Sequence, residues 1–340
     1  MFSLLRPALF TLPPETAHAL TIAALDMAGW RRPPVPDPIL ATQLADLLFP
    51  TPIGLAAGFD KDARAWRGAL GLGFGFVEVG TLTPRPQAGN PRPRIFRLVE
   101  DRAVINRLGF NNGGLQAALP RIMRHPLMGV NVGANKDSAD RIADYVLGVA
   151  SVRTQAAWIT LNISSPNTPG LRGLQGEALP ELLAAAMGAR GTGGPPLFLK
   201  VAPDLDAEQM DGIADAVLAA GMDALIVSNT MVARPDTLRS GNKDEAGGLS
   251  GAPLMGPSTA VLREFALRLQ GRVPLIGVGG ISTAADVLAK LKAGASAVQL
   301  YTAMIYAGPG LPGRLNRDLA ALLRQQGFRS VAEAVGADLR

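Results

Sequence analysis

The stretch PLIGVGGISTAADVLAKLKAGASAVQLYT, residues 274–302, contains one complete repeat of the pattern that decides the fold. It begins with an apolar run that ends on Gly279 and Gly280, and it closes with a second apolar run that ends on Tyr301 and Thr302. The residues between these runs place their apolar side chains at helical spacing. A strand, a helix and another strand in this order predict a βαβ unit with parallel strands.

The same alternation extends through the chain from residue 50 onward. Six more short apolar or β-branched runs precede the quoted stretch, at residues 52–58, 74–81, 128–135, 157–164, 196–203 and 223–230. Amphipathic helical segments lie between most of them. Eight buried strands that alternate with helices predict the α/β class and a (β/α)8 TIM barrel, with its active site at the carboxyl ends of the strands.

Two connections are longer than a barrel needs. Residues 93–114 contain two extended runs around a Val-Glu-Asp-Arg turn, which predicts an inserted β-hairpin that ends in a polar loop. Residues 231–273 are longer than one helix requires and contain the sequence GGLSGAPL. Both insertions follow the carboxyl ends of strands, so we expect them to cover the mouth of the barrel.

The first 38 residues have a different pattern. Apolar residues recur at helical spacing in residues 2–9 and again in residues 19–27, and Pro13 and Pro14 separate the two segments. This predicts a helical hairpin followed by a proline-rich linker that ends at residue 38. The predicted domains are therefore an N-terminal module and a barrel, at residues 1–38 and 39–340.

Charged or polar residues interrupt the apolar positions of this module at Arg6, Glu15, His18 and Asp26, so we do not expect it to be a signal peptide. The sequence has no uninterrupted apolar run of the roughly 18 residues that a membrane span requires. Two interpretations stay open. The module is either an amphipathic cap on the barrel or a hairpin that lies on a membrane surface.

Composition excludes several kinds of chemistry. The 340 residues include no cysteine, which excludes disulfides, thiolate catalysis, iron–sulfur ligation and cysteine-based zinc sites. With only two histidines, a His-rich metal centre or a Ser-His-Asp triad is hard to build, and we expect no metal. The net charge of +5 suits an anionic partner, but the basic residues are scattered and we expect no nucleic acid.

The carboxyl ends of the predicted strands carry small, polar or cationic residues. In chain order these are Ala57, Gly58 and Lys61, then Gly80 and Thr81, Asn131, Asn162 with Ser165 and Asn167, Lys200, Ser228 to Thr230, Gly279 and Gly280, and Tyr301 with Thr302. Chain reversal would explain the glycines, but not two lysines and several carboxamides around one rim. The rim is therefore predicted to hold a ligand. The glycines of the last strands, with Gly251, are typical of a phosphate site.

Lys200 has two functional interpretations. It either forms a Schiff base, as in barrel aldolases, or remains a cation that stabilises the reduced, anionic form of a cofactor. A Schiff-base enzyme normally needs an acid–base partner, and none of these strand ends carries a carboxylate. A phosphate-anchored flavin fits the second interpretation.

The motifs also resemble those of a known family. GLAAGFDK, VGTLTPRPQAGNPRPRIFRL, INRLGFNN, GVNVGANK, NISSPNTPGLRGLQ, SNT with GGLSGAPL, GVGGI and QLYTA occur in order over nearly the whole chain, together with the N-terminal ETAH. This series resembles the class 2, quinone-dependent dihydroorotate dehydrogenases. The resemblance implies an FMN barrel that oxidises (S)-dihydroorotate to orotate in de novo pyrimidine synthesis. It also implies electron transfer to a membrane quinone, ubiquinone or menaquinone.

The resemblance assigns roles to individual residues. The implied FMN contacts are Ala57, Gly58, Lys61, Thr81, Asn131, Asn162, Lys200, Ser228, Gly251, Gly280, Tyr301 and Thr302. The implied substrate contacts are Lys61, Asn162, Asn167, Asn229, Thr230 and the loop of Asn106, Arg107, Leu108, Gly109 and Phe110. The implied groups of the quinone tunnel are His18, Arg97 and Tyr301.

Ser165 is the implied catalytic base, with Thr168 as a relay of the proton to water. A serine hydroxyl is a weak base in water, so its contribution must come from position and desolvation. Class 1 enzymes place cysteine at the base position, and one branch of them uses an iron–sulfur partner subunit. A chain without cysteine therefore resembles class 2, with no iron–sulfur partner and a peripheral location on the cytoplasmic face of a bacterial inner membrane.

Three alternatives remain at this stage. The first is another flavin barrel, such as a dihydropyrimidine-type reductase or a flavin-dependent tRNA-reducing enzyme. The second is a Schiff-base aldolase that uses Lys200, and the third is a non-catalytic barrel associated with a membrane. One departure from the family pattern is Ala134, where the family often has Lys or Gly; we expect this to alter only the packing beside the flavin.

Overall fold

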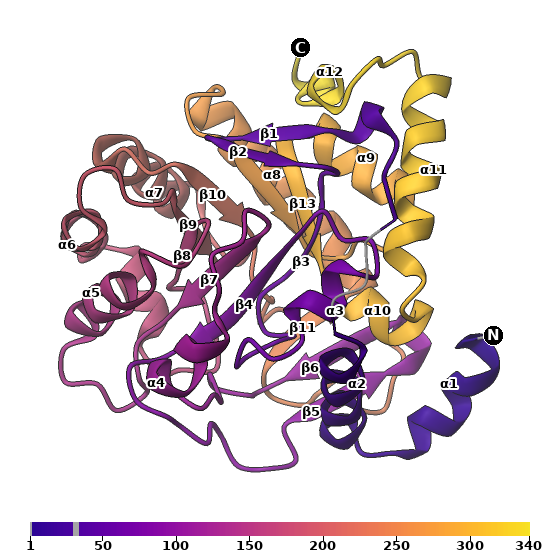
Figure 1. Ribbon diagram of the computed structural model, residues 1–340, viewed down its shortest axis with the longest axis horizontal. Helices are drawn as coiled ribbons and strands as arrows, with labels where there is room; N and C mark the ends of the chain where they lie inside the picture. Colours follow the sequence, from indigo (N-terminus) through magenta and orange to yellow (C-terminus); the bar gives the residue numbers. More distant parts are fainter. Residues whose placement is uncertain (1, 30–33) are drawn as a thin grey trace.

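The computed structural model describes residues 2–29 and 34–340, and a closed barrel of eight parallel strands forms its centre (Figure 1). Each barrel strand pairs with the next one along the chain, and the last pairs with the first. In order around the ring they are β3 (Ile53–Leu55), β4 (Phe76–Leu82), β7 (Met128–Val132), β8 (Ile159–Asn162), β9 (Leu197–Val201), β10 (Ala224–Val227), β12 (Leu275–Val278) and β13 (Ala295–Leu300). All eight predicted strands are present, which confirms the TIM barrel.

Helices surround the barrel, and capping residues fix where several of them start. The hydroxyl of Thr283 accepts a hydrogen bond from the backbone N–H of Asp286, whose carboxyl group accepts one from the backbone N–H of Thr283 at the start of α9 (Ala284–Lys292). Asp206 and Gln209 form the same reciprocal pair at the start of α7 (Ala207–Ala220). The helices of the barrel and its carboxyl end are α3 (Trp66–Leu70), α4 (Leu115–Ala118), α5 (Arg141–Val152), α6 (Leu179–Arg190), α7 (Ala207–Ala220), α8 (Met255–Leu269), α9 (Ala284–Lys292), α10 (Thr302–Ala307), α11 (Leu311–Gln325) and α12 (Val331–Ala334). Short 3-10 helices are η1 (Pro38–Leu40), η2 (Val99–Asp101), η3 (Leu119–Arg121), η4 (Leu171–Gln175), η5 (Ala252–Leu254) and η6 (Ala337–Leu339).

A small hairpin that the sequence analysis missed closes the amino end of the barrel. Its strands, β1 (Thr42–Leu44) and β2 (Leu47–Phe49), are too short to show a periodic pattern. Phe49 stacks on Phe76 with ring centroids 4.3 Å apart, and Trp158 contacts both rings edge-on. These buried aromatic side chains fill the amino end of the barrel and leave the carboxyl end as its open end.

The mouth is covered by a three-stranded antiparallel sheet, which we call the lid sheet. The predicted hairpin supplies β5 (Ile95–Leu98) and β6 (Ala103–Asn106), joined by η2. The third strand, β11 (Gly248–Gly251), comes from the insertion after β10 and pairs with β6. Its glycine-rich sequence has little strand character of its own, so only the pairing with β6 makes it a strand.

The predicted N-terminal hairpin is present as α1 (Phe2–Thr11) and α2 (Pro14–Ala28). Pro14 occupies the first position of α2, where its missing N–H breaks no hydrogen bond. The two helices lie beside the lid sheet at one end of the molecule (Figure 1). The predicted linker lies partly in residues 30–33, outside the described residues, and continues as irregular chain to η1.

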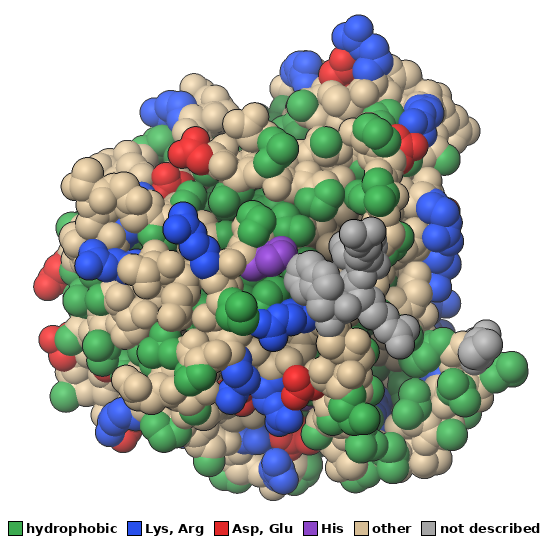
Figure 2. All heavy atoms as spheres, in the orientation of Figure 1, with side chains coloured by type: hydrophobic (Ala, Val, Ile, Leu, Met, Phe, Trp, Pro, Cys, Tyr) green, Lys and Arg blue, Asp and Glu red, His purple; other side chains and the backbone are tan. Residues whose placement is uncertain are grey.

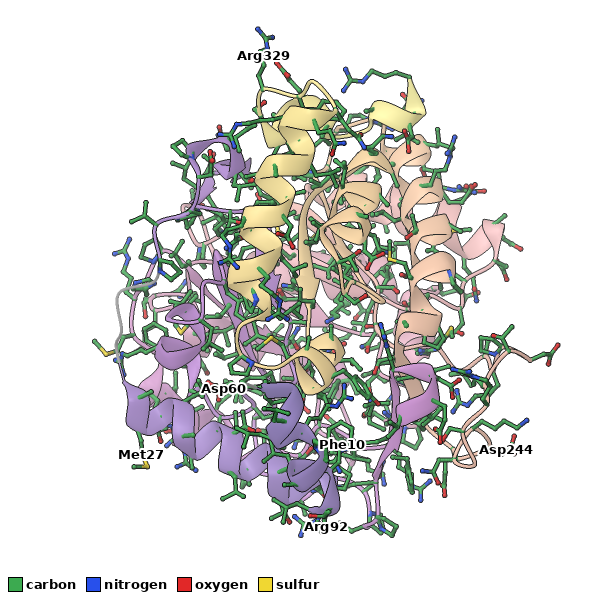
Figure 3. All side chains as sticks on the ribbon, turned by 90° about the vertical axis from the view of Figure 1, so that its right-hand side faces the viewer. Phe10, Met27, Asp60, Arg92, Asp244 and Arg329 are labelled. Carbon is green, nitrogen blue, oxygen red and sulfur yellow. The ribbon has the colours of Figure 1, made fainter. Side chains whose placement is uncertain are left out.

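Large apolar side chains of this hairpin are exposed. Leu4, Leu5, Leu20 and Met27 have exposed fractions of 82%, 55%, 55% and 89%. Figure 2 shows hydrophobic side chains over the corner where α1 lies, and in Figure 3 Met27 projects away from the body of the molecule. In the described part of the chain, no helix has the length and hydropathy that crossing a membrane would require.

Candidate active site

A cavity of about 930 Å³ opens at the carboxyl ends of the barrel strands and extends between the lid sheet and the N-terminal hairpin. Most of the predicted site residues line it: His18, Ala57, Gly58, Lys61, Thr81, Arg97, Asn106, Leu108, Gly109, Phe110, Asn162, Ser165, Asn167, Lys200, Ser228, Asn229, Thr230, Gly251, Gly280, Tyr301 and Thr302. Three predicted residues, Arg107, Asn131 and the proposed relay Thr168, are not among the lining residues. One cavity therefore gathers the residues that the resemblance assigns to cofactor, substrate and quinone tunnel.

A chain of side-chain hydrogen bonds fixes the cavity wall at β4, β7 and β8. The amide of Asn162 donates to Thr81 Oγ1 over 2.9 Å, and this hydroxyl donates to Asn131 Oδ1 over 2.6 Å. Asn131 in turn donates to the carboxyl group of Glu78 over 2.7 Å. Asn131 is fully buried and holds Thr81, which itself lines the cavity; its predicted contact with the cofactor stays a prediction.

Glu78 is a buried acid that the sequence analysis did not single out. Its carboxyl group accepts hydrogen bonds from Asn131, from Gln299 over 2.9 Å and from Trp158 over 3.4 Å. Burial lowers the pKa of Lys200 and the negative charge of Glu78 opposes that shift. The sequence could have indicated this site, because Glu78 is the one charged residue in the apolar run FGFVEVGT. Its carboxyl group supplies a countercharge for Lys200.

Ser165 lies on the loop after β8, and hydrogen bonds to other residues fix this loop. Its hydroxyl oxygen accepts a hydrogen bond from the backbone N–H of Asn167 over 3.3 Å, and its side chain faces the cavity. Nearby, the buried Thr168 Oγ1 has no hydrogen-bond partner among the described residues. The Ser165 hydroxyl is therefore available to a ligand in the cavity, whereas the Thr168 hydroxyl is buried with its hydrogen-bonding capacity unused in the described part of the chain.

Arg172, in the quoted motif PGLRGLQ, fixes this loop. Its guanidinium donates to the backbone oxygens of Ser164 and Thr230, over 3.0 and 2.9 Å, and pairs with Asp204 at 2.8 Å. The loop that carries Ser165 is thus tied to the loop after β10. Nothing in the sequence around Arg172 indicates this role, because its partners lie on other loops.

The part of the cavity lined by the predicted substrate contacts is cationic and rich in amides. Lys61 donates to the backbone oxygen of Gly58 over 2.9 Å, and burial lowers the pKa of this lysine to about 8. Asn167 donates to Asn106 Oδ1 over 3.3 Å, which joins the Ser165 loop to the end of β6. Arg107 instead pairs with Glu245 at 2.7 Å, away from the cavity lining.

The opposite end of the cavity fits the phosphate of a flavin. Gly280 has a φ of +80°, and a Cβ there would lie 2.3 Å from the backbone N of Met255. Gly251 has a φ of +99°, and a Cβ there would lie 2.4 Å from the backbone oxygen of Arg102. The hydroxyls of Thr302 and Ser250 lie 2.9 Å apart beside these glycines. The two glycines let neighbouring backbone segments pack closely here, and glycine backbone beside paired hydroxyls is the kind of lining that binds a phosphate. We call this part of the cavity the glycine cradle.

The predicted tunnel residues come together where the hairpin meets the barrel. The Tyr301 hydroxyl and His18 Nδ1 lie 3.3 Å apart, and Phe59, which the sequence analysis missed, contacts both rings edge-on. Burial lowers the pKa of His18 to about 3, so its ring is neutral at pH 7. Arg97 donates to the backbone oxygens at positions 10 and 12, over 3.1 and 2.9 Å.

Known proteins resemble this chain throughout its length. The family model described as dihydroorotate dehydrogenase matches residues 39–323. Proteins named dihydroorotate dehydrogenase (quinone) from Novosphingobium aromaticivorans and Erythrobacter litoralis are both 53% identical to the chain. The alignments cover 99% of this chain in both cases, and 99% and 100% of the two relatives.

Solved structures agree with these relatives. Two crystal structures of the Eimeria tenella dihydroorotate dehydrogenase, one with ferulenol and one ligand-free, superpose with a TM-score of 0.92 at 42% identity. The match covers 96% of this chain in both cases, and 96% and 99% of the two solved chains. The aldolase and non-catalytic alternatives find no support in these matches. The chain therefore belongs to the dihydroorotate dehydrogenase family and, within it, to the quinone-dependent, flavin-using enzymes.

Proposed function

We propose that FMN is the flavin of this enzyme and that Ser165 is its catalytic base. The overall reaction follows from the family: dihydroorotate is oxidised to orotate in pyrimidine biosynthesis, and the electrons pass to a quinone. The observation that carries the proposal is that a single cavity joins the Ser165 hydroxyl, the Lys200 side chain and the glycine cradle. A flavin with one terminal phosphate fits the space between Lys200 and that cradle.

The bound flavin would supply the acceptor for the hydride that leaves one ring carbon of dihydroorotate. Ser165 would remove the proton from the neighbouring carbon. The buried Thr168 hydroxyl, which has no partner in the described part of the chain, would receive that proton and pass it to water. Asn162 and Asn167 would orient the substrate, since carboxamides both donate to and accept from its ring. Lys200 would stabilise negative charge as the cofactor region gains electrons.

The proposal is tested by an anaerobic absorbance spectrum of the purified holoenzyme. Dihydroorotate should bleach the oxidised flavin band, and a water-soluble quinone should then restore it. Mass spectrometry of the released cofactor should give FMN. A colourless protein, or a released flavin other than FMN, would contradict the cofactor assignment, whereas a flavin band that dihydroorotate does not change would contradict the substrate assignment.

We also propose that residues 1–38 form a membrane-association and quinone-tunnel module, joined to an FMN barrel of residues 39–340. The exposed leucines of α1 and α2 support membrane contact, and the cavity wall that His18 and Arg97 form supports a tunnel. A quinone dissolved in a bilayer would then reach the cavity between the two helices. The location we propose is the cytoplasmic face of a bacterial inner membrane, as a peripheral protein.

A further inference from the structure

A buried arginine outside the reaction centre connects the N-terminal hairpin to the loop before the lid sheet. The Arg94 guanidinium is 6% exposed, and its Nε and Nη2 lie 3.1 and 2.8 Å from a carboxyl oxygen of Glu15 on α2. Its Nη1 donates to the backbone oxygens of Ala88 and Asn90, over 2.6 and 2.9 Å. All three nitrogens of this guanidinium are therefore engaged, two by the helix and one by the loop.

The loop that Arg94 holds is the one that supports the substrate contacts. The side-chain amide of Asn90 donates to the backbone oxygens of Asn167 and Arg107, each over 3.1 Å. The backbone N–H of Asn90 donates to the backbone oxygen of Leu108 over 3.0 Å. Continuous hydrogen bonds thus run from Glu15 through Arg94 and Asn90 to the backbone on both sides of the substrate end of the cavity.

The ion pair is buried on the side of Arg94, and Glu15 is partly buried and shared with a second arginine. The Glu15 side chain is 23% exposed and also pairs with Arg92 at 3.0 Å, at the edge of the molecule shown in Figure 3. Removing one partner of a buried ion pair leaves the other charge without compensation, which favours rearrangement of the segment that carries it. For Arg94, that segment is the loop beneath Asn167. His18, three residues after Glu15 on α2, lines the other side of the same cavity.

We infer that Glu15 and Arg94 are positioning residues for dihydroorotate: the ion pair uses the N-terminal helix α2 as the support that sets the geometry of the substrate loop. This inference rests on the proposed function, in which Asn167 and the 106–110 loop hold the substrate. Neither Glu15 nor Arg94 touches the reacting atoms. Their effect therefore falls on substrate binding and not on the chemical step.

The test compares Glu15→Gln with the wild-type holoenzyme. Orotate affinity is measured from the shift that orotate causes in the flavin spectrum, and KM for dihydroorotate and kcat are measured with a water-soluble quinone. We expect Kd and KM to rise about tenfold while kcat changes less than about threefold. The matched control is Asp26→Asn, on the same helix as Glu15. It breaks the exposed ion pair between Asp26 and Arg64 and should change none of these values.

A second variant separates positioning from general loss of structure. Glu15→Asp keeps the charge and shortens the side chain by one methylene, so it should raise Kd for orotate by a smaller factor and load flavin fully. If both variants bind flavin and bind orotate with the wild-type Kd, the inference is wrong and the proposed function stands. If the wild-type holoenzyme itself does not bind orotate, the proposed function fails first.

Discussion

Ser165 is the residue on which the proposed chemistry depends, and its surroundings explain how a hydroxyl can serve as a base. The loop after β8 is clamped by Arg172, so the hydroxyl has one preferred position. Ser165 and Thr168 are both buried, with exposed fractions of 6% and 2%, so bulk water competes little for the Ser165 hydroxyl. Position and desolvation replace intrinsic basicity at this site.

Ser165→Ala should reduce the rate of flavin reduction by dihydroorotate about 10²- to 10⁴-fold, because the general base is lost while the amide contacts remain. Orotate affinity should change little. Anaerobic stopped-flow absorbance measures the rate. Ser164→Ala is the matched control, since that neighbouring hydroxyl hydrogen-bonds Asn162 and Asn229 and does not line the cavity. An equal loss in both variants would contradict the role of Ser165.

If Lys61 contacts the substrate as proposed, substrate binding should depend on pH. Burial lowers its pKa to about 8, so the free enzyme loses this positive charge as the pH rises through that value. The affinity for the anionic carboxylate of orotate should fall at higher pH, by up to about tenfold per pH unit for one proton. Titrations of orotate between about pH 7 and 9.5 measure this slope. The pH dependence of orotate affinity should vanish in Lys61→Met and persist in Lys243→Met, the control at an exposed lysine. Orotate affinity that does not change with pH in the wild-type enzyme would contradict the prediction.

The strand-end residues were predictable because a polar side chain after an apolar run is visible in the sequence itself. Glu78, Arg172 and Arg94 were not, since each acquires its role from partners on other elements. Arg107 illustrates the opposite case. It belongs to a loop assigned to the substrate, but its guanidinium turns to Glu245, and no local pattern indicates that direction.

At the scale of elements, the repeating strands and helices were predictable because each one has its own periodicity or cap. The lid sheet was only half predictable. The sequence pattern of β5 and β6 predicts a hairpin. In contrast, β11 becomes a strand only by pairing with β6, about 145 residues away in the chain. The β1–β2 hairpin was missed for a related reason, since strands of three residues carry too little pattern.

The N-terminal hairpin allows a prediction about membranes. Replacing Leu4 and Leu5, which are exposed and do not line the cavity, by Glu should sharply reduce binding to anionic lipid vesicles, because each buried leucine contributes about 1.5–3 kcal/mol and a charge disfavours insertion. Activity with a water-soluble quinone should stay within about twofold of wild type. Co-sedimentation with vesicles measures binding. Leu267→Glu, at an exposed leucine of α8, is the control, and equal sedimentation of all variants would contradict the proposal.

The whole molecule depends on tight packing at the closed end of the barrel. A Cβ at Gly129 would lie 1.9 Å from Trp158 Cε2, and that indole is buried among Phe49, Phe76 and Phe198. Gly129→Ala should therefore lower the free energy of unfolding by about 3 kcal/mol, through overpacking that the aromatic cluster cannot relieve. Urea denaturation followed by circular dichroism measures the change.

A Gly→Ala substitution at an exposed helix position is the control for Gly129→Ala. Gly212 lies on the exposed face of α7, and a Cβ there would meet open space. Gly212→Ala should raise the free energy of unfolding by about 0.5–1 kcal/mol, since alanine has the higher helix propensity. If Gly129→Ala were as harmless as Gly212→Ala, the aromatic end of the barrel would have to be less tightly packed than its contacts indicate.

Closure of the barrel has a consequence for the synthesis of the chain. The free edge of β3 pairs with β13, and about 245 residues separate the ends of these two strands. At roughly 5–20 residues per second, a ribosome needs about 12–50 seconds to supply the partner strand. During that interval an apolar strand presents unpaired N–H and C=O groups, which favour association with other chains. The nascent polypeptide is thus most prone to aggregation before translation ends, when chaperones that act at the ribosome are of greatest use to it.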